Sequence, residues 1–207
     1  MTITNPFLQD LAMDDKLILV DGLDRQVGTA SKQDAHAKGL LHRAFSVLLV
    51  RNGARGLEVL LAQRAEHKYH SGGLWANSCC SHPRLGEKTS EAARRRVAEE
   101  LGCEVVGLRE VAAFVYRAEF ANGLVEHEYD HVFVGWHSQA LMPNPAEVGA
   151  VRWIGIDDLA KELYAQPKQF APWAHVVLSM GIKELQEAKQ KGCSPLLGKE
   201  EHPHRSS

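Results

Sequence analysis

The sequence predicts a mixed α/β (α+β) fold, in which a β-sheet sandwich is flanked by helices. Two observations lead to this fold class. Pairs of apolar runs are joined by short turn signals, which is typical of β-hairpins. One strongly helical segment lies between the two hairpins, and further helical segments follow them. Hairpins interrupted by helices favour a mixed sheet over a strict alternation of strands and helices.

The expected elements follow from local patterns along the chain. We expect strands over 17–20, 44–50, 57–61, 111–120, 124–136 and 151–154. A helix is expected over 89–101, where Thr89 or Ser90 can cap the start and Gly102 ends it. Further helices are expected over 157–164, with an aspartate cap, and from Pro172 to about 191. The glycine-rich segment 68–77 is expected to be irregular.

The length of 207 residues suits one domain with a substantial core. Hydrophobic residues make up 44% and charged residues 24%, which is the usual balance of a globular protein. We expect a flexible segment over 1–14, a single domain over 15–191 and a disordered tail over 192–207, because the tail has few apolar residues.

Charge and hydropathy exclude several classes of protein. The formal net charge of -2 gives no basic field for nucleic acid. No apolar run reaches the length that crosses a bilayer, and the first residues lack the pattern of a signal peptide. A long chain with four cysteines and no regular cysteine spacing is expected to keep them as thiols. We therefore expect a cytoplasmic monomer without membrane or nucleic-acid partners.

Two adjacent cysteines, Cys79 and Cys80, stand in the segment N-S-C-C-S-H-P (77–83). Such a segment could hold a metal, a disulfide, a nucleophile or two small packed side chains. A disulfide between neighbours would be strained, because their Cα atoms lie closer than a disulfide prefers. The other three alternatives stay open from the segment alone.

Carboxylates and histidines elsewhere offer a metal site. In the expected strand L-V-E-H-E-Y-D-H-V-F-V (124–134) side chains alternate, so its three acidic residues, which include Asp130, share one face. Polar alternation is common on edge strands, but a buried acidic face needs a cation or a shared proton. Two carboxylates and three histidines would form a nitrogen and oxygen site for a divalent transition metal. The candidate ligands are His36, His42, His82, Glu126 and Glu128.

The central helical segment carries charges at helical spacing. Arg95 and Glu99, and likewise Arg96 and Glu100, are four residues apart and share a face. Ordinary salt bridges on a solvated helix explain such pairs in most proteins. The alternative is that carboxylates at the junction of loop and helix hold Mg²⁺, which in turn holds a diphosphate.

The spacing of this segment resembles the Nudix box, G-x5-E-x7-R-E-U-x-E-E-x-G-U, in which U is apolar. The matching positions are Ser81, Glu87, Arg95, Arg96, Val97, Glu99, Glu100, Gly102 and Cys103. Serine replaces the first glycine, and Arg96 replaces the glutamate that follows the first arginine. A Nudix hydrolase uses that glutamate in its metal cluster, so its loss argues against hydrolysis of a diphosphate.

The sequence as a whole resembles the type I isopentenyl-diphosphate delta-isomerases, which have the Nudix fold. The matching segments are 32–46, Q-R-A-E-H-K (63–68), G-L-W-A-N-S-C-C-S-H-P (73–83), the modified Nudix box, Y-R-A (116–118), E-H-E (126–128) and A-P-W (171–173). The resemblance runs from about residue 15 to 190. It implies a Nudix-type mixed sheet and an isomerase of isoprenoid biosynthesis that interconverts isopentenyl diphosphate and dimethylallyl diphosphate.

The resemblance also implies roles for the candidate residues. The catalytic side chains would be Cys80, Glu128, Tyr116 and Trp173. One divalent metal, Mn²⁺ or Zn²⁺, would be bound by His36, His42, His82, Glu126 and Glu128. Mg²⁺ would join the substrate diphosphate to Glu100 and the Cys80 carbonyl. The phosphate oxygens would be held by Lys32, Arg64, Lys68 and Arg96.

The implied reaction needs an acid and a base on opposite faces of a flat five-carbon substrate. Cys80 and Glu128 would be this pair, with Tyr116 beside the carboxylate and Trp173 over the cationic intermediate. Cys79 would then be a small packed side chain. Two other functions fit the same motifs: a Nudix hydrolase of a diphosphate-containing substrate, which would release phosphate, and a non-catalytic metal-binding or regulatory module.

Overall fold

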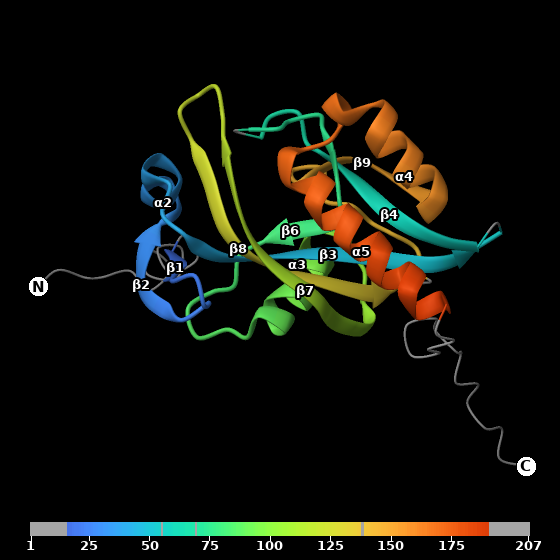
Figure 1. Ribbon diagram of the computed structural model, residues 1–207, viewed down its shortest axis with the longest axis horizontal. Coiled ribbons are helices and arrows are strands. Elements are labelled where there is room, and N and C mark those ends of the chain that lie inside the picture. Colours follow the sequence, from blue (N-terminus) through green and yellow to red (C-terminus); the bar gives the residue numbers. More distant parts are fainter. Residues whose placement is uncertain (1–15, 55, 69, 138, 191–207) are drawn as a thin grey trace, which may run out of the picture.

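A computed structural model of the protein describes residues 16–190 except 55, 69 and 138 (Figure 1). The segments expected to be flexible or disordered, 1–14 and 192–207, lie outside the described residues. The strands are β1 (Lys16–Val20), β2 (Gln26–Ser31), β3 (His42–Gly53), β4 (Gly56–Arg64), β5 (Trp75–Ala76), β6 (Cys79–Ser81), β7 (Val106–Glu119), β8 (Val125–Trp136) and β9 (Val148–Gly155). The helices are α2 (Lys32–Lys38), α3 (Thr89–Leu101), α4 (Ile156–Ala165), the short 3-10 helix η1 (Pro167–Gln169) and α5 (Pro172–Gln190).

Strand β3 is the centre of the sheet. It pairs in parallel with β8 along most of its length and antiparallel with β1, β4 and β6. The hairpin partner of β8 is β7, and β4 carries β9 and the two-residue strand β5. The described strands therefore form one mixed sheet, which confirms the fold class expected from the sequence.

The two faces of the sheet bury separate hydrophobic cores, because side chains alternate along β3. Phe45, Val47 and Leu49 pack with the alanines, valine and leucine of α3. Leu48 and Val50 point the other way and pack under α4 and α5. Figure 1 shows the red helix α5 crossing one face of the sheet. None of the described helices has both the length and the apolar character needed to cross a bilayer.

Two predicted helix caps are wrong. The residue that precedes α3 is Lys88, and no side chain caps this end; the N–H groups of Glu91 and Ala92 donate to the Lys88 carbonyl. At α4 the cap is Gly155, and Asp157 lies in the first turn, where its charge still favours the positive end of the helix dipole. The predicted end of α3 is confirmed, since Gly102 adopts φ 63° and its N–H donates to Ala98.

Helix α2 and strands β2 and β6 were not expected from the sequence. The helix has only seven residues and lacks an apolar stripe, so no periodicity predicts it. Its start is nevertheless well defined, because the Ser31 hydroxyl accepts from the N–H of Asp34 at 3.1 Å. Gly39, at φ 62°, ends the helix and turns the chain toward β3. This short helix places His36 against the end of the sheet.

Candidate active site

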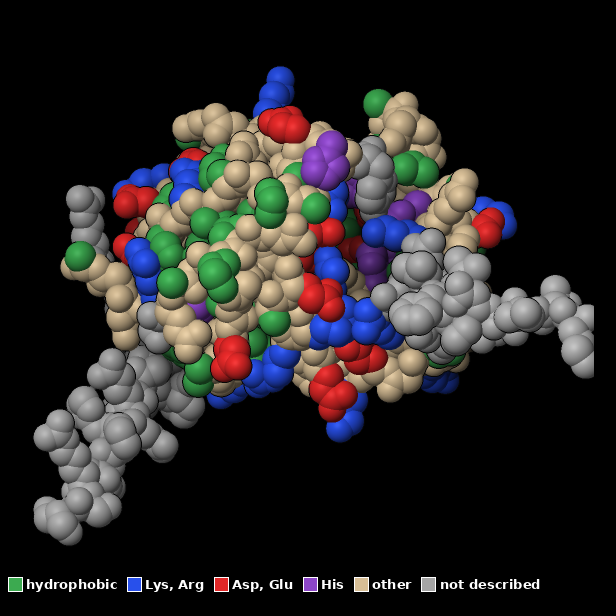
Figure 2. Space-filling model, turned by 180° about the vertical axis from the view of Figure 1, so that it is seen from behind, with side chains coloured by type: hydrophobic (Ala, Val, Ile, Leu, Met, Phe, Trp, Pro, Cys, Tyr) green, Lys and Arg blue, Asp and Glu red, His purple; other side chains and the backbone are tan. Residues whose placement is uncertain are grey.

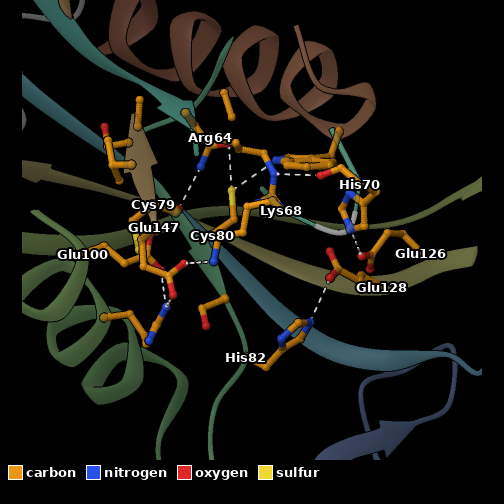
Figure 3. Close-up of a pocket in the computed structure, with 18 of the residues that line it drawn as sticks. Arg64, Lys68, His70, Cys79, Cys80, His82, Glu100, Glu126, Glu128 and Glu147 are labelled. Atoms are coloured by element: carbon orange, nitrogen blue, oxygen red, sulfur yellow. Dashed lines mark hydrogen bonds and ion pairs between the residues drawn. The ribbon is translucent and has the colours of Figure 1, made fainter. Parts of the chain in front are cut away.

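A pocket of about 140 Å³ opens at the end of the sheet where β3, β6 and β8 lie side by side. Its lining residues come from β4, β6, β7 and β8, from α2, α3 and α5, and from the loop after β4. Charged and histidine side chains gather at this hollow in the surface (Figure 2). The close-up in Figure 3 shows that residues distant in the sequence point toward one another here.

Three histidines and two glutamates meet beside one end of this pocket, and we call them the histidine–carboxylate cluster; His82 and the two glutamates also line the pocket itself. Its members are His36, His42, His82, Glu126 and Glu128. The ligand atoms of the first four lie within 4.8 Å of one another. Glu128 joins them through Oε1, which lies 3.0 Å from Nε2 of His82 and 3.6 Å from Nε2 of His42. The structure thus brings together all five metal ligands expected from the sequence.

Sheet register explains why this cluster forms. Strands β3 and β8 are parallel, and His42 lies directly opposite Glu128. The alternation of β8 then puts Glu126 on the same face, as the sequence predicted. His127 and His131 point away from the pocket, to the carbonyl of Gly39 and to Asp24.

Burial keeps His36 and His82 uncharged. It lowers the pKa of His36 to about 3 and that of His82 to about 4, and the neighbouring imidazoles add to the effect. Burial raises the pKa of Glu126 to about 9, together with the charge of Glu128. For Glu128 itself, the imidazoles of His42 and His82 beside its carboxylate outweigh burial and hold its pKa well below the usual range. At neutral pH Glu126 therefore carries a proton unless a cation takes its place, because imidazole binds metals in its neutral form and a carboxylate in its charged form.

The cluster fits a divalent cation. Nδ1 of His42 donates to the Leu40 carbonyl at 2.8 Å, which leaves Nε2 facing the cluster as an acceptor. This Nε2 and Oε2 of Glu126 are 3.9 Å apart, buried, and without a hydrogen-bond partner among the described residues. Two electron-rich atoms buried without a donor are an unfavourable arrangement that a shared proton or a bound cation would relieve. Three nitrogens and two carboxylates suit an ion such as Zn²⁺ or Mn²⁺.

The adjacent cysteines point to opposite faces of β6. Cys79 is 2% exposed and packs in the core beneath α3. Cys80 faces the pocket, where its thiol donates to Oδ1 of Asn77 at 3.0 Å and accepts from Nε1 of Trp173 at 3.2 Å. Burial, followed by the nearby carboxyl of Asp130, raises the pKa of Cys80 to about 12. The pocket therefore holds a protonated thiol at neutral pH.

A buried polar chain lies behind this thiol. Oγ of Ser46 is 3.5 Å from the sulfur of Cys80 and donates to Oδ2 of Asp130 at 2.8 Å. Asp130 is almost fully buried, and burial raises its pKa well above the usual range. The chain runs along one face of the sheet because Ser46 lies opposite Cys80 in the β3–β6 register.

A second acid–base group comes from the β7–β8 hairpin. Tyr116 lies opposite Glu128 in the register, and its hydroxyl donates to Oε2 at 2.6 Å. Burial, helped by the charge of Glu128, raises the pKa of Tyr116 well above its usual value. The carboxylate of Glu128 thus bridges the phenol and the histidines.

Four basic side chains line the other end of the pocket, and we call them the cationic wall: Lys32, Arg64, Lys68 and Arg96. Arg96 donates to Oε1 of Glu100 at 2.6 Å, and Lys68 is paired with Glu147. Arg96 also lies 3.8 Å from Oε1 of Glu147. Burial lowers the pKa of Lys32 and raises that of Glu100.

The charged residues of α3 divide between the pocket and the surface. Arg96 and Glu100 line the pocket. Arg95 turns to Glu87, which it contacts through two hydrogen bonds of 2.8 Å, and Glu99 is exposed. The Arg95–Glu99 pair that the sequence predicted is present at 3.3 Å, and the shorter bonds of Arg95 to Glu87 join the preceding loop to the helix.

Trp173 stands between the two ends of the pocket. Its indole N–H donates to Cys80, and the guanidinium of Arg64 lies over the ring at 5.2 Å from the centroid. The sequence led us to expect the ring beside a cationic intermediate; in the structure the ring already accepts a cation on its face.

Sequence patterns assigned no role to five residues that lie in the pocket or directly behind it: Ser46, His70, Asn77, Asp130 and Glu147. Asn77 lies in the segment N-S-C-C-S-H-P (77–83) and Asp130 in the acidic strand 124–134, so the sequence did carry a signal for these two residues. His70 and Glu147 lie in irregular segments without any such pattern, and only the tertiary structure shows their position.

Comparisons with known proteins agree on one family. A family model described as "NUDIX domain" matches residues 40–174. A protein of Photobacterium profundum named "Isopentenyl-diphosphate Delta-isomerase" is 46% identical over 179 residues, which cover 84% of this chain and 98% of the relative. A protein of Burkholderia multivorans with the same name is 48% identical over 168 residues, which cover 80% and 92% of the two chains.

Solved structures support the fold. The crystal structure of DR0079 from Deinococcus radiodurans has a TM-score of 0.63 at 18% identity and covers 79% of this chain and 97% of its own. A MutT NUDIX hydrolase from Burkholderia pseudomallei has a TM-score of 0.53 at 20% identity and covers 68% and 97% of the two chains. At such low identity the likeness establishes the shared fold alone.

Proposed function

We propose, from the premise that this chain belongs to the Nudix family and within it to the isopentenyl-diphosphate Delta-isomerases, that the pocket described above is its active site. The protein is an isomerase that interconverts isopentenyl diphosphate and dimethylallyl diphosphate. One observation carries the assignment of the site: the thiol of Cys80 and the Tyr116–Glu128 pair face the same small pocket, beside a cationic wall.

The reaction moves a double bond along a five-carbon chain. A proton adds to the terminal CH₂ carbon, which leaves a tertiary cationic centre at the branched carbon. A second proton leaves the carbon on the far side of that centre, and its electron pair becomes the new double bond. No atom is gained or lost overall, so the protein has to supply one proton donor and one proton acceptor.

Cys80 and Glu128 supply this pair. In the substrate-free pocket the raised pKa of Cys80 keeps its thiol protonated, and the lowered pKa of Glu128 keeps its carboxylate charged. Tyr116 donates to Glu128 and can relay a proton to or from it. The roles of the pair reverse when the reaction runs in the other direction.

The residues that would hold a structural or catalytic cation are the five of the histidine–carboxylate cluster. A bound Zn²⁺ or Mn²⁺ would fix the Glu128 carboxylate and stabilise its charged form. Tyr116 and His82 already orient that carboxylate from two sides. The chain itself therefore aims Glu128 at the pocket.

The cationic wall would bind the diphosphate. Guanidinium and ammonium groups at one end of a pocket hold phosphate oxygens through charge-assisted hydrogen bonds. Glu100, with the Cys80 carbonyl, would hold the Mg²⁺ that accompanies the diphosphate. Glu100 and Cys80 line the same pocket as the cationic wall, which supports this assignment.

The cationic intermediate has to be protected from water, which would trap it as an alcohol. The rings of Trp173 and Tyr116 line the pocket, and the indole of Trp173 contacts the thiol. An aromatic face stabilises a nearby cation by its quadrupole, with the strongest effect for tryptophan. We assign Trp173 this role, with its N–H anchored on Cys80.

Isotope exchange tests the proposed function directly. Purified protein is incubated with isopentenyl diphosphate and Mg²⁺ in heavy water, and deuterium in the dimethylallyl product is measured by mass spectrometry. We expect label in the product from the wild-type protein and none above background from Cys80→Ala. Absence of label from the wild-type protein would overturn the proposal, and release of inorganic phosphate would indicate a hydrolase instead.

We further propose that the enzyme acts as a monomer in the cytoplasm, with one domain over 15–191. The three described cysteines are free thiols, as is usual in a reducing compartment. Light scattering of the purified protein measures its molar mass, and a dimer mass would overturn the monomer.

A further inference from the structure

His70 lies on the loop between β4 and β5 and takes no part in the roles assigned above. Its side chain is 4% exposed, although the loop around it is largely irregular. A histidine on a loop is usually at the surface, so this degree of burial has to be explained by what the ring contacts.

Two aromatic rings fix the orientation of His70. Phe120, at the β7–β8 turn, stacks on the imidazole with 4.3 Å between centroids and 16° between planes. Trp173 contacts it edge-on at 5.7 Å and 85°. The ring is therefore held between the hairpin and α5, and its Nε2 can point in one direction only.

That direction is toward Glu126. Nε2 of His70 lies 2.7 Å from Oε1 of Glu126, and Figure 3 shows the two side chains facing each other. When Glu126 is ionised to bind a cation, its oxygen accepts, so Nε2 of His70 carries the hydrogen and donates it. The other oxygen, Oε2, lies 3.3 Å from His36 and 3.9 Å from His42.

The two oxygens of Glu126 thus have separate partners. Oε1 is held from outside the histidine–carboxylate cluster, and Oε2 faces into it. Without His70 the carboxylate could rotate and turn either oxygen away from the cluster. Hydrogen bonds from outside a metal site orient the ligands in this way, and their loss weakens metal binding.

We propose that His70 is a positioning residue that fixes the carboxylate of Glu126 so that Oε2 binds the cation of the histidine–carboxylate cluster. This inference rests on the metal centre of the proposed function. The loop after β4 would then contribute to both ends of the pocket, since it also carries Lys68 of the cationic wall. The loop would join the metal end of the pocket to the diphosphate end.

The test compares the Zn²⁺ affinity of variants by competition with a chromophoric chelator. His70→Phe keeps an aromatic ring for stacking but removes the donor, and we expect a loss of affinity of roughly 10- to 100-fold. His70→Gln places an amide N–H at nearly the reach of Nε2 and should recover most of the affinity. His70→Asn is too short and should not. The matched control is His67→Ala, an exposed histidine of the same loop, which should bind like the wild type.

The affinities of these variants either support or overturn the positioning role of His70. Equal affinity of His70→Phe and the wild type would overturn the inference. Equal loss in His70→Phe and His70→Gln, with a changed visible spectrum of bound Co²⁺, would make His70 a ligand and overturn the positioning role. If His70→Phe fails to fold, as judged by circular dichroism, the comparison of His70→Gln with His70→Asn decides. A wild-type protein that binds no Zn²⁺, Mn²⁺ or Co²⁺ would overturn the metal centre itself, and the inference with it.

Discussion

The two ends of the pocket satisfy their charges in opposite ways. In the histidine–carboxylate cluster, buried electron-rich atoms such as Nε2 of His42 and Oε2 of Glu126 face each other without a donor. In the cationic wall, Arg96 and Lys68 are already paired with Glu100 and Glu147. The buried atoms at one end need a shared proton or a cation. At the other end Arg96 and Lys68 already have carboxylate partners before the substrate arrives, and only Nε of Arg96 lacks a hydrogen-bond partner there among the described residues.

This difference indicates how long the cation and the diphosphate substrate each stay bound. A site with unsatisfied buried groups gains the most from its ligand and is suited to a cation that remains bound. A wall whose charges are already paired gains less, because a diphosphate has to compete with resident carboxylates. Weaker net binding suits a substrate and product that must leave after each turnover.

The largest effect is expected at the histidine–carboxylate end. Glu128→Gln keeps the shape but removes the charge that bridges Tyr116 and His82. We expect turnover to fall about 10²- to 10⁴-fold, the usual range for an acid–base group, and the bound metal to be weakened. Steady-state kinetics and metal analysis measure both. Glu110→Gln, on the neighbouring strand, is the control; retention of turnover in Glu128→Gln would remove this end from the mechanism.

The second largest effect is expected at Cys80, whose thiol lies between the two ends of the pocket. Cys80→Ser keeps a small polar side chain but raises the pKa of the acid–base group far above that of a thiol. We expect a loss of roughly a hundredfold or more in turnover. An epoxide analogue of the substrate should alkylate Cys80, and mass mapping of the modified peptide locates the label.

Cys79→Ser is the matched control for Cys80, because the two residues share a strand but not a face. Its hydroxyl would enter the core beneath α3 and should lower the free energy of unfolding by about 1–3 kcal/mol if left without a partner. Turnover per folded molecule should be nearly unchanged. Alkylation of Cys79, or equal loss of turnover in both variants, would place the wrong thiol in the pocket.

A smaller effect is expected at the cationic wall. Glu147→Gln removes a carboxylate that competes with the diphosphate for Lys68 and Arg96. If the pairing is worth roughly 0.5–1 kcal/mol, KM should fall about two- to fivefold with kcat little changed. Glu58→Gln, which breaks a comparable pair with Arg51 on the β3–β4 hairpin, should leave KM unchanged. A rise in KM for Glu147→Gln would mean that this end also depends on its carboxylate to bind substrate.

Local patterns in the sequence predicted the parts of the fold that depend on near neighbours. The apolar runs of the β3–β4 hairpin, the helix α3 and the alternation of β8 are visible within a dozen residues, and the structure has all three. The expectation that Glu126 and Glu128 share a face is confirmed for the same reason. The departure at Arg96 correctly pointed away from the hydrolases.

Other features depend on contacts that no local pattern encodes. Helix α2 is too short to show periodicity, and its place is set by the Ser31 cap and by the turn at Gly39. His70 and Glu147 approach the pocket from loops, through partners 56 and 79 residues away in the chain. Such pairings follow from the parallel contact of β3 with β8 and from the docking of loops, which only the folded chain defines.

The smallest effect is expected at Arg95, which lies just outside the cationic wall. Arg95 is next to Arg96 in the sequence, but it contacts Glu87 in the loop before α3 and does not line the main pocket. If this pair only holds the loop to the helix, its loss should change stability and leave KM unchanged. Glu87→Gln therefore tests whether Arg95 lies outside the cationic wall.

The pKa of Glu87 determines how the stability difference between Glu87→Gln and the wild type depends on pH. Hydrogen bonds from Arg95 lower the pKa of Glu87 below its ordinary value of 4.5. A lowered pKa in the folded state stabilises the protein above pH 4.5, and this contribution is lost as the pH falls and the carboxylate takes up a proton. Urea unfolding at pH 7 should therefore show Glu87→Gln less stable than the wild type by about 1 kcal/mol, and the difference should shrink below pH 4. Glu91→Gln, exposed on the same helix, should show almost no difference at either pH. A pH-independent difference, or a raised KM in Glu87→Gln, would mean that the Glu87–Arg95 pair also acts on the substrate end of the pocket.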